Sequence, residues 1–384
     1  MKITNVEPIV LHAQDTGENS TDKANVGGYS GYQVVVHVET DEGIDGWGEC
    51  AVGGEFGEAA QAVKVLIEKG LAPRVKGENP VEYRKIWDRL YSAVEPYGRR
   101  GLAIFALSGI DTAMIDIAGK ASRVPASTLL GGKYRTEIPL YASLLFDMDD
   151  PEGTAEKGLQ YLRQGYVGTK FGWGANPSKP FGKNPEEDEK IVATIRETIG
   201  PNPWLMVDVG RYVNWSPSYA IEMARRLEKY NIFWLEEPLP RDDIDGYVTL
   251  TNSVNVTIAA GEGSQTLFDF KELLAKKAVD LIQPDVSKAG GLSETKRIVE
   301  LAGSNNVMWV PHNWSTAINT AASLQLVASS PDAFLLEFKQ EPNPLVHGLS
   351  KKGFNVKNGR MLIPEEPGLG IEIDADILKE YQVN

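Results

Sequence analysis

The spacing of apolar and polar positions in the first third of the chain predicts an α+β domain. Residues 3–12 and 32–50 alternate apolar and polar side chains, which predicts strands, and Asp41, Glu42 and Gly43 predict a hairpin turn inside the second segment. Apolar residues then recur every three or four positions, which predicts helices over about 55–72, 80–95 and 101–120.

From about residue 138 the rhythm changes, and short β-rich segments alternate with helical ones. The eight predicted strands are 138–143, 167–172, 204–209, 233–238, 257–263, 281–286, 307–312 and 334–338. Repeated β–α units imply a parallel sheet, and eight of them over about 200 residues imply a closed barrel. After about residue 345 the pattern decays into loop and strand.

The predicted fold is therefore α/β, with a (β/α)8 TIM-like barrel and an N-terminal α+β capping domain that the C-terminal tail completes. The expected domain ranges are 1–125 for the cap, 126–345 for the barrel and 346–384 for the segment that returns to the cap.

Composition narrows the classes of partner. A formal net charge of −14 argues against nucleic acid and against anionic membrane surfaces. Cys50 is the single cysteine, so no intramolecular disulfide can form. The first residues lack the layout of a signal peptide, and no apolar run suggests a membrane span, so we expect a cytoplasmic protein.

An ionisable residue closes seven successive predicted strands. These residues are Lys170, Asp208, Glu236, Glu262, Asp285, His312 and Glu337. A single acid at a strand end is usually a helix cap or a solvated loop residue, but seven in succession are hard to assign to chance. The C-terminal ends of barrel strands meet at one rim, where barrel active sites lie. We therefore expect these side chains to share one site.

Three of the acids, Asp208, Glu236 and Glu262, close consecutive strands. Because side chains alternate along a strand, Glu236 is expected to point into the barrel mouth and Glu237 to the other side. Three converging carboxylates repel one another, and a hard divalent cation with oxygen ligands offsets that repulsion. Mg²⁺, one per subunit, fits best because it leaves positions open for substrate oxygens.

The next two strands end in Asp285 and His312. A carboxylate bonded to one imidazole nitrogen fixes the tautomer and raises the basicity of the ring. His312 is therefore the best candidate for a general acid–base in the chain, with Asp285 as its partner.

The segments VDVG, WLEEP, AAGEG, QPDVSKAGG, VPHNW and LLEF, in this order and spacing, resemble the mandelate racemase subgroup of the enolase superfamily over essentially the whole chain. The resemblance implies Asp208, Glu236 and Glu262 as Mg²⁺ ligands, Asp285 and His312 as a catalytic dyad, and Glu337 as a hydrogen-bond partner of the substrate carboxylate. It also implies a homo-oligomer.

The second barrel strand departs from that family's frequent Lys-x-Lys pattern. Counted from Gly165, Lys170 takes the place of the first lysine and Gly172 that of the second. In that register Lys170 is an electrostatic partner, whereas a slip of the register would make Lys170 itself the base. With His312 as the main acid–base group, elimination on one face is favoured over racemisation, which needs a proton donor on each face.

The sequence therefore predicts a Mg²⁺-dependent dehydratase of an anionic polyhydroxy acid, an aldonate such as lyxonate or gluconate, giving a 2-keto-3-deoxy acid. Three alternatives are a racemase or epimerase that uses Lys170 and His312 on opposite faces, a Schiff-base aldolase on Lys170, and a non-catalytic metal-binding protein. Candidate substrate contacts are Arg99, Arg100, Arg211 and Trp314, with the loops 13–31 and 95–101 expected to close over the site.

Overall fold

The capping domain is built on an antiparallel sheet that joins both ends of the chain. In the computed structural model, which describes residues 1–13, 31–54, 56–210 and 213–383, its strands are β1 (Ile3–His12), β2 (Tyr32–Thr40), β3 (Asp45–Cys50) and β14 (Gln382–Val383). Their order is β14-β1-β2-β3. The C-terminal strand pairs with β1, so the prediction that the tail completes the cap is confirmed.

Helices of the cap follow the predicted positions. They are α1 (Glu58–Val65), the π-helical segment η2 (Leu66–Leu71), α2 (Ala72–Val75), the 3₁₀ turn η3 (Pro80–Glu82), α3 (Tyr83–Gly98), α4 (Leu102–Ser122) and α5 (Ala126–Leu129). Helix α4 packs directly on β3. The two elements approach so closely that a Cβ on Gly48 would lie 1.9 Å from the carbonyl oxygen of Gly109, so this contact requires glycine. Among the described residues, α4 alone is long and apolar enough to cross a membrane, but 89% of its most apolar window is buried, as in a core helix.

The second half of the chain forms the predicted barrel. Its strands are β4 (Glu137–Leu145), β5 (Gly168–Gly172), β6 (Trp204–Asp208), β7 (Trp234–Glu236), β8 (Thr257–Ala260), β9 (Leu281–Ile282), β10 (Met308–Trp309) and β11 (Leu336–Lys339). Each overlaps a predicted segment. The strands are parallel, and β11 pairs with β4 to bring the ends of the sheet together. Several observed strands end earlier than predicted, because the residues that follow no longer make the hydrogen bonds of the parallel sheet.

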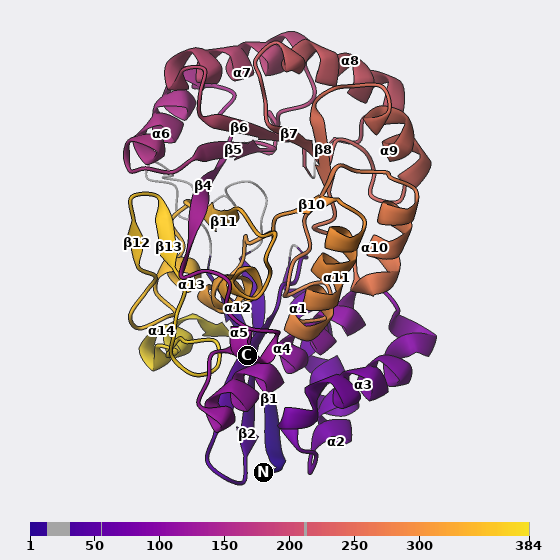
Figure 1. Cartoon of the computed structure of the whole chain (residues 1–384), viewed down its shortest axis with the longest axis vertical. Coiled ribbons are helices and arrows are strands. Elements are labelled where there is room, and N and C mark those ends of the chain that lie inside the picture. The colour runs from indigo at the N-terminus through magenta and orange to yellow at the C-terminus, as the bar shows by residue number, and fades with distance from the viewer. Residues whose placement is uncertain (14–30, 55, 211–212, 384) are drawn as a thin grey trace.

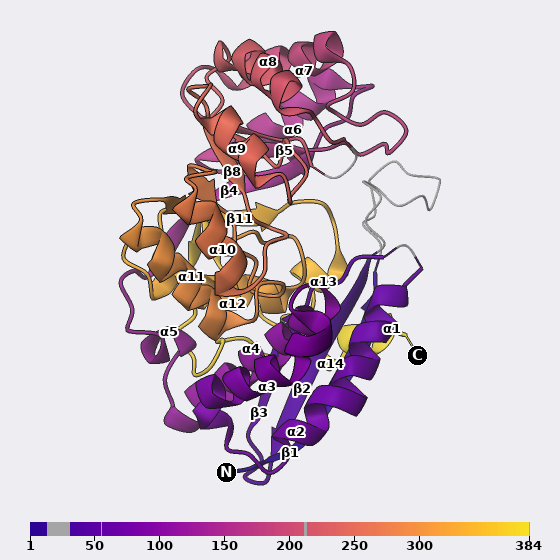
Figure 2. The ribbon, with the colours of Figure 1, turned by 90° about the vertical axis from the view of Figure 1, so that its right-hand side faces the viewer.

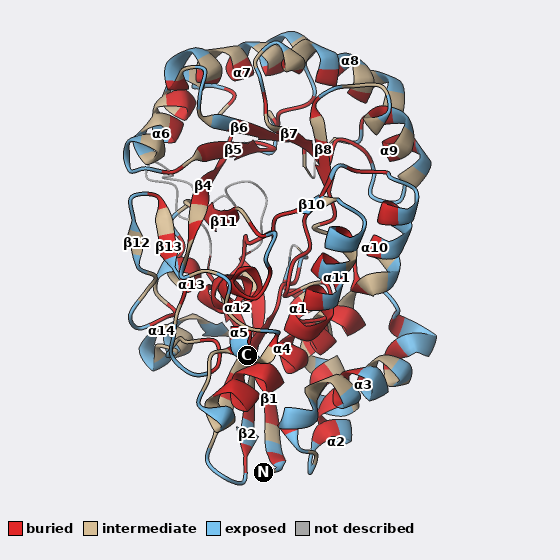
Figure 3. Cartoon of the chain, in the orientation of Figure 1, coloured by how far each residue is buried: buried red, intermediate tan, exposed pale blue. Residues whose placement is uncertain are grey.

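Seven helices connect the eight strands and cover the outside of the barrel (Figure 1). They are α6 (Pro151–Arg163), α7 (Pro185–Ile199), α8 (Pro217–Glu228), α9 (Ile244–Thr251), α10 (Thr266–Ala275), α11 (Leu292–Ser304) and α12 (Ala317–Ala328). Their inner faces and the strands are buried, and their outer faces are exposed (Figure 3). The eighth strand is followed only by the four-residue helix α13 (Pro344–His347), which ends at Gly348.

The C-terminal tail contacts both parts of the molecule. The hairpin of β12 (Val356–Lys357) and β13 (Arg360–Leu362) first adds to β4 of the barrel. Only α14 (Ala375–Tyr381) and β14 then reach β1. The tail therefore contacts the barrel as well as the cap. The expected domain boundaries at 125 and 345 stay predictions.

The cap lies against the barrel helices that follow the last strands. Figure 2 shows α4 beside α11 and α12, and α12 also contacts β3. Because α11 and α12 follow the strands that precede Asp285 and His312, this arrangement brings the cap next to the predicted dyad.

Candidate active site

The sheet register brings the ends of three barrel strands to one level. Gly172 on β5 is paired with Asp208 on β6, which is paired with Glu236 on β7. A Cβ on Gly172 would lie 3.4 Å from Oδ2 of Asp208, so position 172 faces the barrel mouth next to that carboxylate. Lys170 lies two residues earlier on the same strand and therefore points to the same side, deeper in the barrel.

Lys170 is the cation at the centre of a buried cluster of carboxylates. Its Nζ lies 2.7 Å from Glu236, 2.9 Å from Glu337 and 3.4 Å from Asp208. Burial alone would lower the pKa of Lys170, but Glu236 and Glu337 raise it well above the usual value. The contacts to three carboxylates favour the cationic form of Lys170, so its geometry suits a counter-ion for them.

Asp208 retains an unfilled acceptor in this cluster. Its Oδ2 is buried and accepts no hydrogen bond from the described residues, although Nζ of Lys170 lies 3.4 Å away. Burial and the neighbouring Glu236 raise the pKa of Asp208 well above its usual value, and Lys170 offsets only part of that rise. A carboxylate in this state is suited to receive a further cation.

Glu337 lies beneath the mouth and is held by three donors. Ser143 Oγ donates to its Oε1 at 2.7 Å, the Asn313 backbone N–H donates to its Oε2 at 2.7 Å, and Lys170 lies 2.9 Å away. Burial alone would raise the pKa of Glu337, but Lys170, His312 and the donors Asn313 and Ser143 together outweigh burial and lower it. The side chain is thus an ionised acceptor that orients Lys170.

The two glutamates of the WLEEP segment have different surroundings. Glu236 is buried and accepts a hydrogen bond from Trp234 Nε1 at 2.8 Å, in addition to its contact with Lys170. Glu237 lies beyond the strand with a positive φ of 46°. This left-handed turn directs it to the backbone N–H of Gly261 and the guanidinium of Arg241, and it lines the cavity.

His312 and Asp285 form a hydrogen-bonded pair. Nδ1 of His312 lies 2.6 Å from Oδ2 of Asp285, and Nε2 lies 3.0 Å from Oε2 of Glu262. Burial and Lys288 act to lower the pKa of His312, but Glu262 and Asp285 outweigh them and raise it to about 10. Burial alone would raise the pKa of Asp285, but Lys288 and His312 lower it.

Two cations at the mouth were not found from the sequence. Arg241 donates from Nε to Glu237 at 2.9 Å and also contacts Glu262. Nζ of Lys288 lies 3.8 Å from Asp285 and 3.9 Å from Glu262. Arg241 follows the strand-end acid Glu236 by five residues and Lys288 follows Asp285 by three, and this short spacing is the signal that could have identified them.

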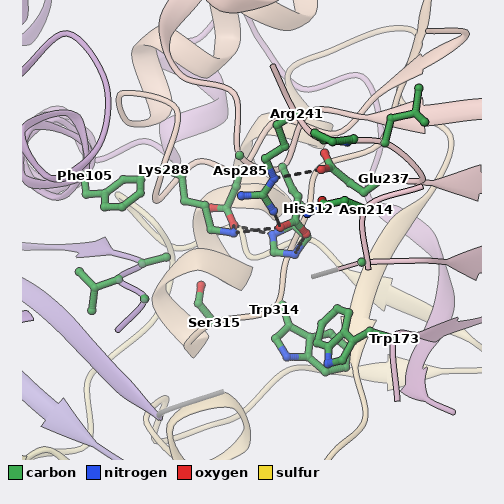
Figure 4. Close-up of a pocket in the computed structure, with 18 residues that line it drawn as sticks. Phe105, Trp173, Asn214, Glu237, Arg241, Asp285, Lys288, His312, Trp314 and Ser315 are labelled. Carbon is green, nitrogen blue, oxygen red and sulfur yellow. Dashed lines mark hydrogen bonds and ion pairs between the residues drawn. The ribbon is translucent and has the colours of Figure 1, made fainter. Parts of the chain in front are cut away.

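A cavity of about 520 Å³ lies between the barrel mouth and the cap (Figure 4). Glu237 lines it, whereas Lys170, Asp208, Glu236 and Glu337 are not among its lining residues, so the expectation that Glu236 would reach the mouth and Glu237 would turn away from it is not met. The cap contributes Ala51, Val52, Gly53 and Phe105 to the lining. The barrel contributes, among others, Trp173, Glu237, Arg241, Glu262, Asp285, Lys288, His312, Trp314 and Ser315. The rings of Trp173 and Trp314 meet edge to face at 5.7 Å and form one wall.

The predicted substrate contacts are only partly brought to this cavity. Trp314 lines it, whereas Arg99 and Arg100 do not. Arg100 instead pairs with Asp242 at 3.0 Å and with Asp269 at 2.9 Å. Arg211 and most of the loop 13–31 lie outside the described residues.

The three predicted metal ligands are neutralised by different cations. Within the described ranges, no three His, Cys, Asp or Glu side chains form a ready-made ligand cluster. Lys170 contacts Asp208 and Glu236, whereas Glu262 is held by Arg241 and His312. The free acceptor of Asp208 and the all-oxygen donor set still fit a hard divalent ion, provided that Glu262 exchanges its present partners for it.

Comparison with known proteins identifies the family. Residues 27–131 match the "Mandelate racemase / muconate lactonizing enzyme, N-terminal domain", and residues 154–377 match the "Enolase C-terminal domain-like" family. Members of this family typically use a divalent metal ion.

Three similar proteins span nearly the whole chain. The D-galactarolactone cycloisomerase of Agrobacterium fabrum is 33% identical over 100% of this chain and 99% of its own. The D-xylonate dehydratase of Haloferax volcanii is 35% identical over 91% of this chain and 85% of its own. The crystal structure of the 3,6-anhydro-D-galactonate cycloisomerase from Zobellia galactanivorans has a TM-score of 0.88 and 33% identity, with 100% of both chains covered. The chain therefore belongs to the mandelate racemase/muconate lactonizing enzyme family of the enolase superfamily, and is an enzyme of that family.

Proposed function

We propose that the protein is a Mg²⁺-dependent dehydratase of an acid sugar, an aldonate such as lyxonate or gluconate. It would remove the proton α to the carboxylate, eliminate the β-hydroxyl group, and release a 2-keto-3-deoxy acid. The observation that carries the proposal is the His312–Asp285 pair, 2.6 Å apart, combined with glycine at position 172 of the same mouth. This combination supplies an acid–base group on one face of the substrate, which favours elimination over racemisation.

In this mechanism His312 carries the proton. Its Nδ1 is bonded to Asp285, and Nε2 lies 3.0 Å from Glu262. Nε2 would face the reacting carbon once Glu262 turned to a divalent ion, and loss of that carboxylate would also lower the pKa of His312. Nε2 would accept the α-proton and then give it to the departing β-hydroxyl group, which leaves as water. The enol that remains tautomerises to the ketone, so one water is lost and no oxidant is needed.

The remaining residues of the site would stabilise the negative charge of the substrate. A divalent ion held by Asp208, Glu236 and Glu262 would stabilise the second negative charge that develops on the substrate carboxylate. Lys170 stays protonated and adds positive potential from below, and Glu337 holds it in position. We therefore propose that Glu337 acts through Lys170, because its own oxygens already accept hydrogen bonds from Ser143 and Asn313.

A cycloisomerase is the second candidate, because two similar proteins that span the full chain carry that name. Opening a sugar ring by elimination uses the same α-proton removal, and the ring oxygen leaves in place of hydroxide. A racemase or epimerase is less well supported, because it needs a second acid–base group where this chain has Gly172. A homo-oligomer and a cytoplasmic location stay predictions from the sequence.

The test is a screen of aldonates and of their lactone and anhydro forms with Mg²⁺, read as semicarbazide-reactive keto acid. The expected result is keto acid from a linear aldonate, with loss of at least about a thousandfold in kcat for His312→Asn. Isothermal titration should show that His312→Asn still binds Mg²⁺. Exchange of the α-proton in D₂O without loss of water would refute the dehydratase, and product from the cyclic forms alone would favour the cycloisomerase.

A further inference from the structure

The capping domain supplies a carboxylate to the N-terminus of α12, the helix that follows His312. Glu49 on β3 is 2% exposed and accepts hydrogen bonds from the backbone N–H of Thr316 at 3.1 Å and of Asn319 at 3.0 Å. Thr316 Oγ1 also donates to Glu49 at 2.6 Å. The first N–H groups of a helix have no partner within the helix, so Glu49 satisfies donors that would otherwise be buried and unpaired.

The same helical turn reaches the dyad. Asn319 Nδ2 donates to Oδ1 of Asp285 at 3.2 Å, and Ser287 donates to that oxygen from its backbone N at 2.8 Å and from Oγ at 2.5 Å. With Oδ1 held by these donors, Oδ2 is left to His312 Nδ1 at 2.6 Å. The plane of the Asp285 carboxylate, and with it the direction of the imidazole ring, is therefore set by groups outside the cavity.

A second link leaves the same turn toward the buried cluster. Thr320 Oγ1 donates to Asn313 Oδ1 at 3.2 Å, and the Asn313 backbone N–H donates to Glu337 at 2.7 Å. The first turn of α12 thus contacts Asp285 itself and one partner of Glu337.

The cap strand that carries Glu49 also reaches the cavity. Beyond β3, Ala51 lines the cavity and its backbone N–H donates to the carbonyl of Ser287 at 3.3 Å. Glu49 and Ala51 therefore hold the cap against the residues on both sides of the dyad, although Glu49 lies 267 positions before Thr316 in the chain.

We propose that Glu49 and Asn319 are positioning residues, which transmit the docking of the cap to Asp285 and, through it, to the direction in which His312 presents Nε2. Neither residue lines the cavity. The kinetic consequence rests on the proposed function, in which His312 is the acid–base group. The structural consequence, a defined orientation of the imidazole, does not depend on the substrate.

Asp111 offers a matched control. It lies on α4 of the cap, is fully buried, and accepts hydrogen bonds from Ser293 N at 2.8 Å and from Ser293 Oγ at 2.7 Å at the start of α11. It therefore docks the cap on a barrel helix through the same kind of contact. Its described hydrogen bonds do not extend to Asp285 or His312.

The experiment compares Glu49→Ala, Asn319→Ala and Asp111→Ala in the full chain. We expect Glu49→Ala and Asp111→Ala to lower the melting temperature, since each removes an acid of the cap that accepts hydrogen bonds from a barrel helix. Only Glu49→Ala and Asn319→Ala should lower kcat, by about tenfold or more with KM changed less than about threefold, because a small misplacement of a catalytic group slows proton transfer. Glu49→Gln keeps the side-chain length and one acceptor oxygen, but its amide nitrogen would face a donor, so it should recover only part of the loss.

A second readout needs no substrate. In protein labelled with ¹⁵N-histidine, the hydrogen-bonded Nδ1–H of His312 is assigned by its absence in His312→Asn. We expect this resonance to shift or broaden in Glu49→Ala and Asn319→Ala and to stay in place in Asp111→Ala. An unmoved resonance in both variants would overturn the proposal. If the wild type turns over no acid sugar, the proposed function fails while this comparison still decides the positioning role.

Discussion

Replacing Lys170 by methionine should make the stability of this protein depend on a divalent cation. Methionine nearly matches the length of the lysine chain, so packing is largely kept, but the contacts to Glu236, Glu337 and Asp208 at 2.7, 2.9 and 3.4 Å are lost. Removing one partner from a buried ion pair costs about 3–5 kcal/mol, because the remaining charge is buried without compensation. For a chain of 384 residues, that loss corresponds to a fall in melting temperature of about 4–6 °C.

The assay is thermal melting of the wild type and of Lys170→Met with and without Mg²⁺. An ion that binds the folded state at 100 times its dissociation constant stabilises it by about 2.7 kcal/mol. We expect Mg²⁺ to raise the melting temperature more in the variant than in the wild type, since the unpaired carboxylates attract the ion more strongly.

Lys296→Met is the control for this prediction. Lys296 is also buried, but its Nζ donates to the carbonyl of Ser329 at 2.7 Å and, among the described residues, pairs with the single carboxylate of Glu300, 3.4 Å away. The fall in melting temperature of Lys296→Met should be smaller than that of Lys170→Met and independent of Mg²⁺. The reasoning is wrong if Lys170→Met melts within about 2 °C of the wild type without Mg²⁺, or if Mg²⁺ raises both proteins equally.

Three further predictions concern single residues. Gly172→Lys should add an acid–base group across the mouth and give measurable epimerisation of the α-carbon, read by NMR in D₂O; a folded variant without any epimer would contradict the one-face argument. Burial raises the pKa of Asp188 from 3.8 to about 7, so the folded state binds its proton more tightly than the unfolded chain, and this carboxyl lowers stability as pH rises from about 4 to 7. Asp188→Asn should therefore remove a loss of up to about 3 kcal/mol of stability between pH 5 and 8. Thermal melting across this range checks it, and an unchanged slope of melting temperature against pH would contradict the assignment. Arg100 is 58% exposed, so Arg100→Ala should change stability by less than about 1 kcal/mol and leave KM unchanged, whereas a large rise in KM would restore it as a substrate contact.

The sequence alone was sufficient to predict the barrel and the rim at which its acidic residues meet. The eight β–α units predict parallel strands, and the alternation of side chains along each strand decides which residues point inward. Asp208, Glu236 and His312 could therefore be selected from local pattern and spacing, since a barrel converts regular spacing along the chain into proximity at one end. The expected roles of these residues in metal binding and proton transfer stay predictions.

The tertiary structure decided the contacts that no periodic pattern encodes. The positive φ of Glu237 turns it back over the mouth, and Arg241 reaches Glu262 across a loop. Arg100, which the sequence suggested for the substrate, instead pairs with acids on the barrel. Glu49 meets the first turn of α12 only because the cap docks there. Apolar periodicity records which face of an element is buried, but the partner of a polar side chain depends on how distant elements pack, and that information arises only when the chain is folded.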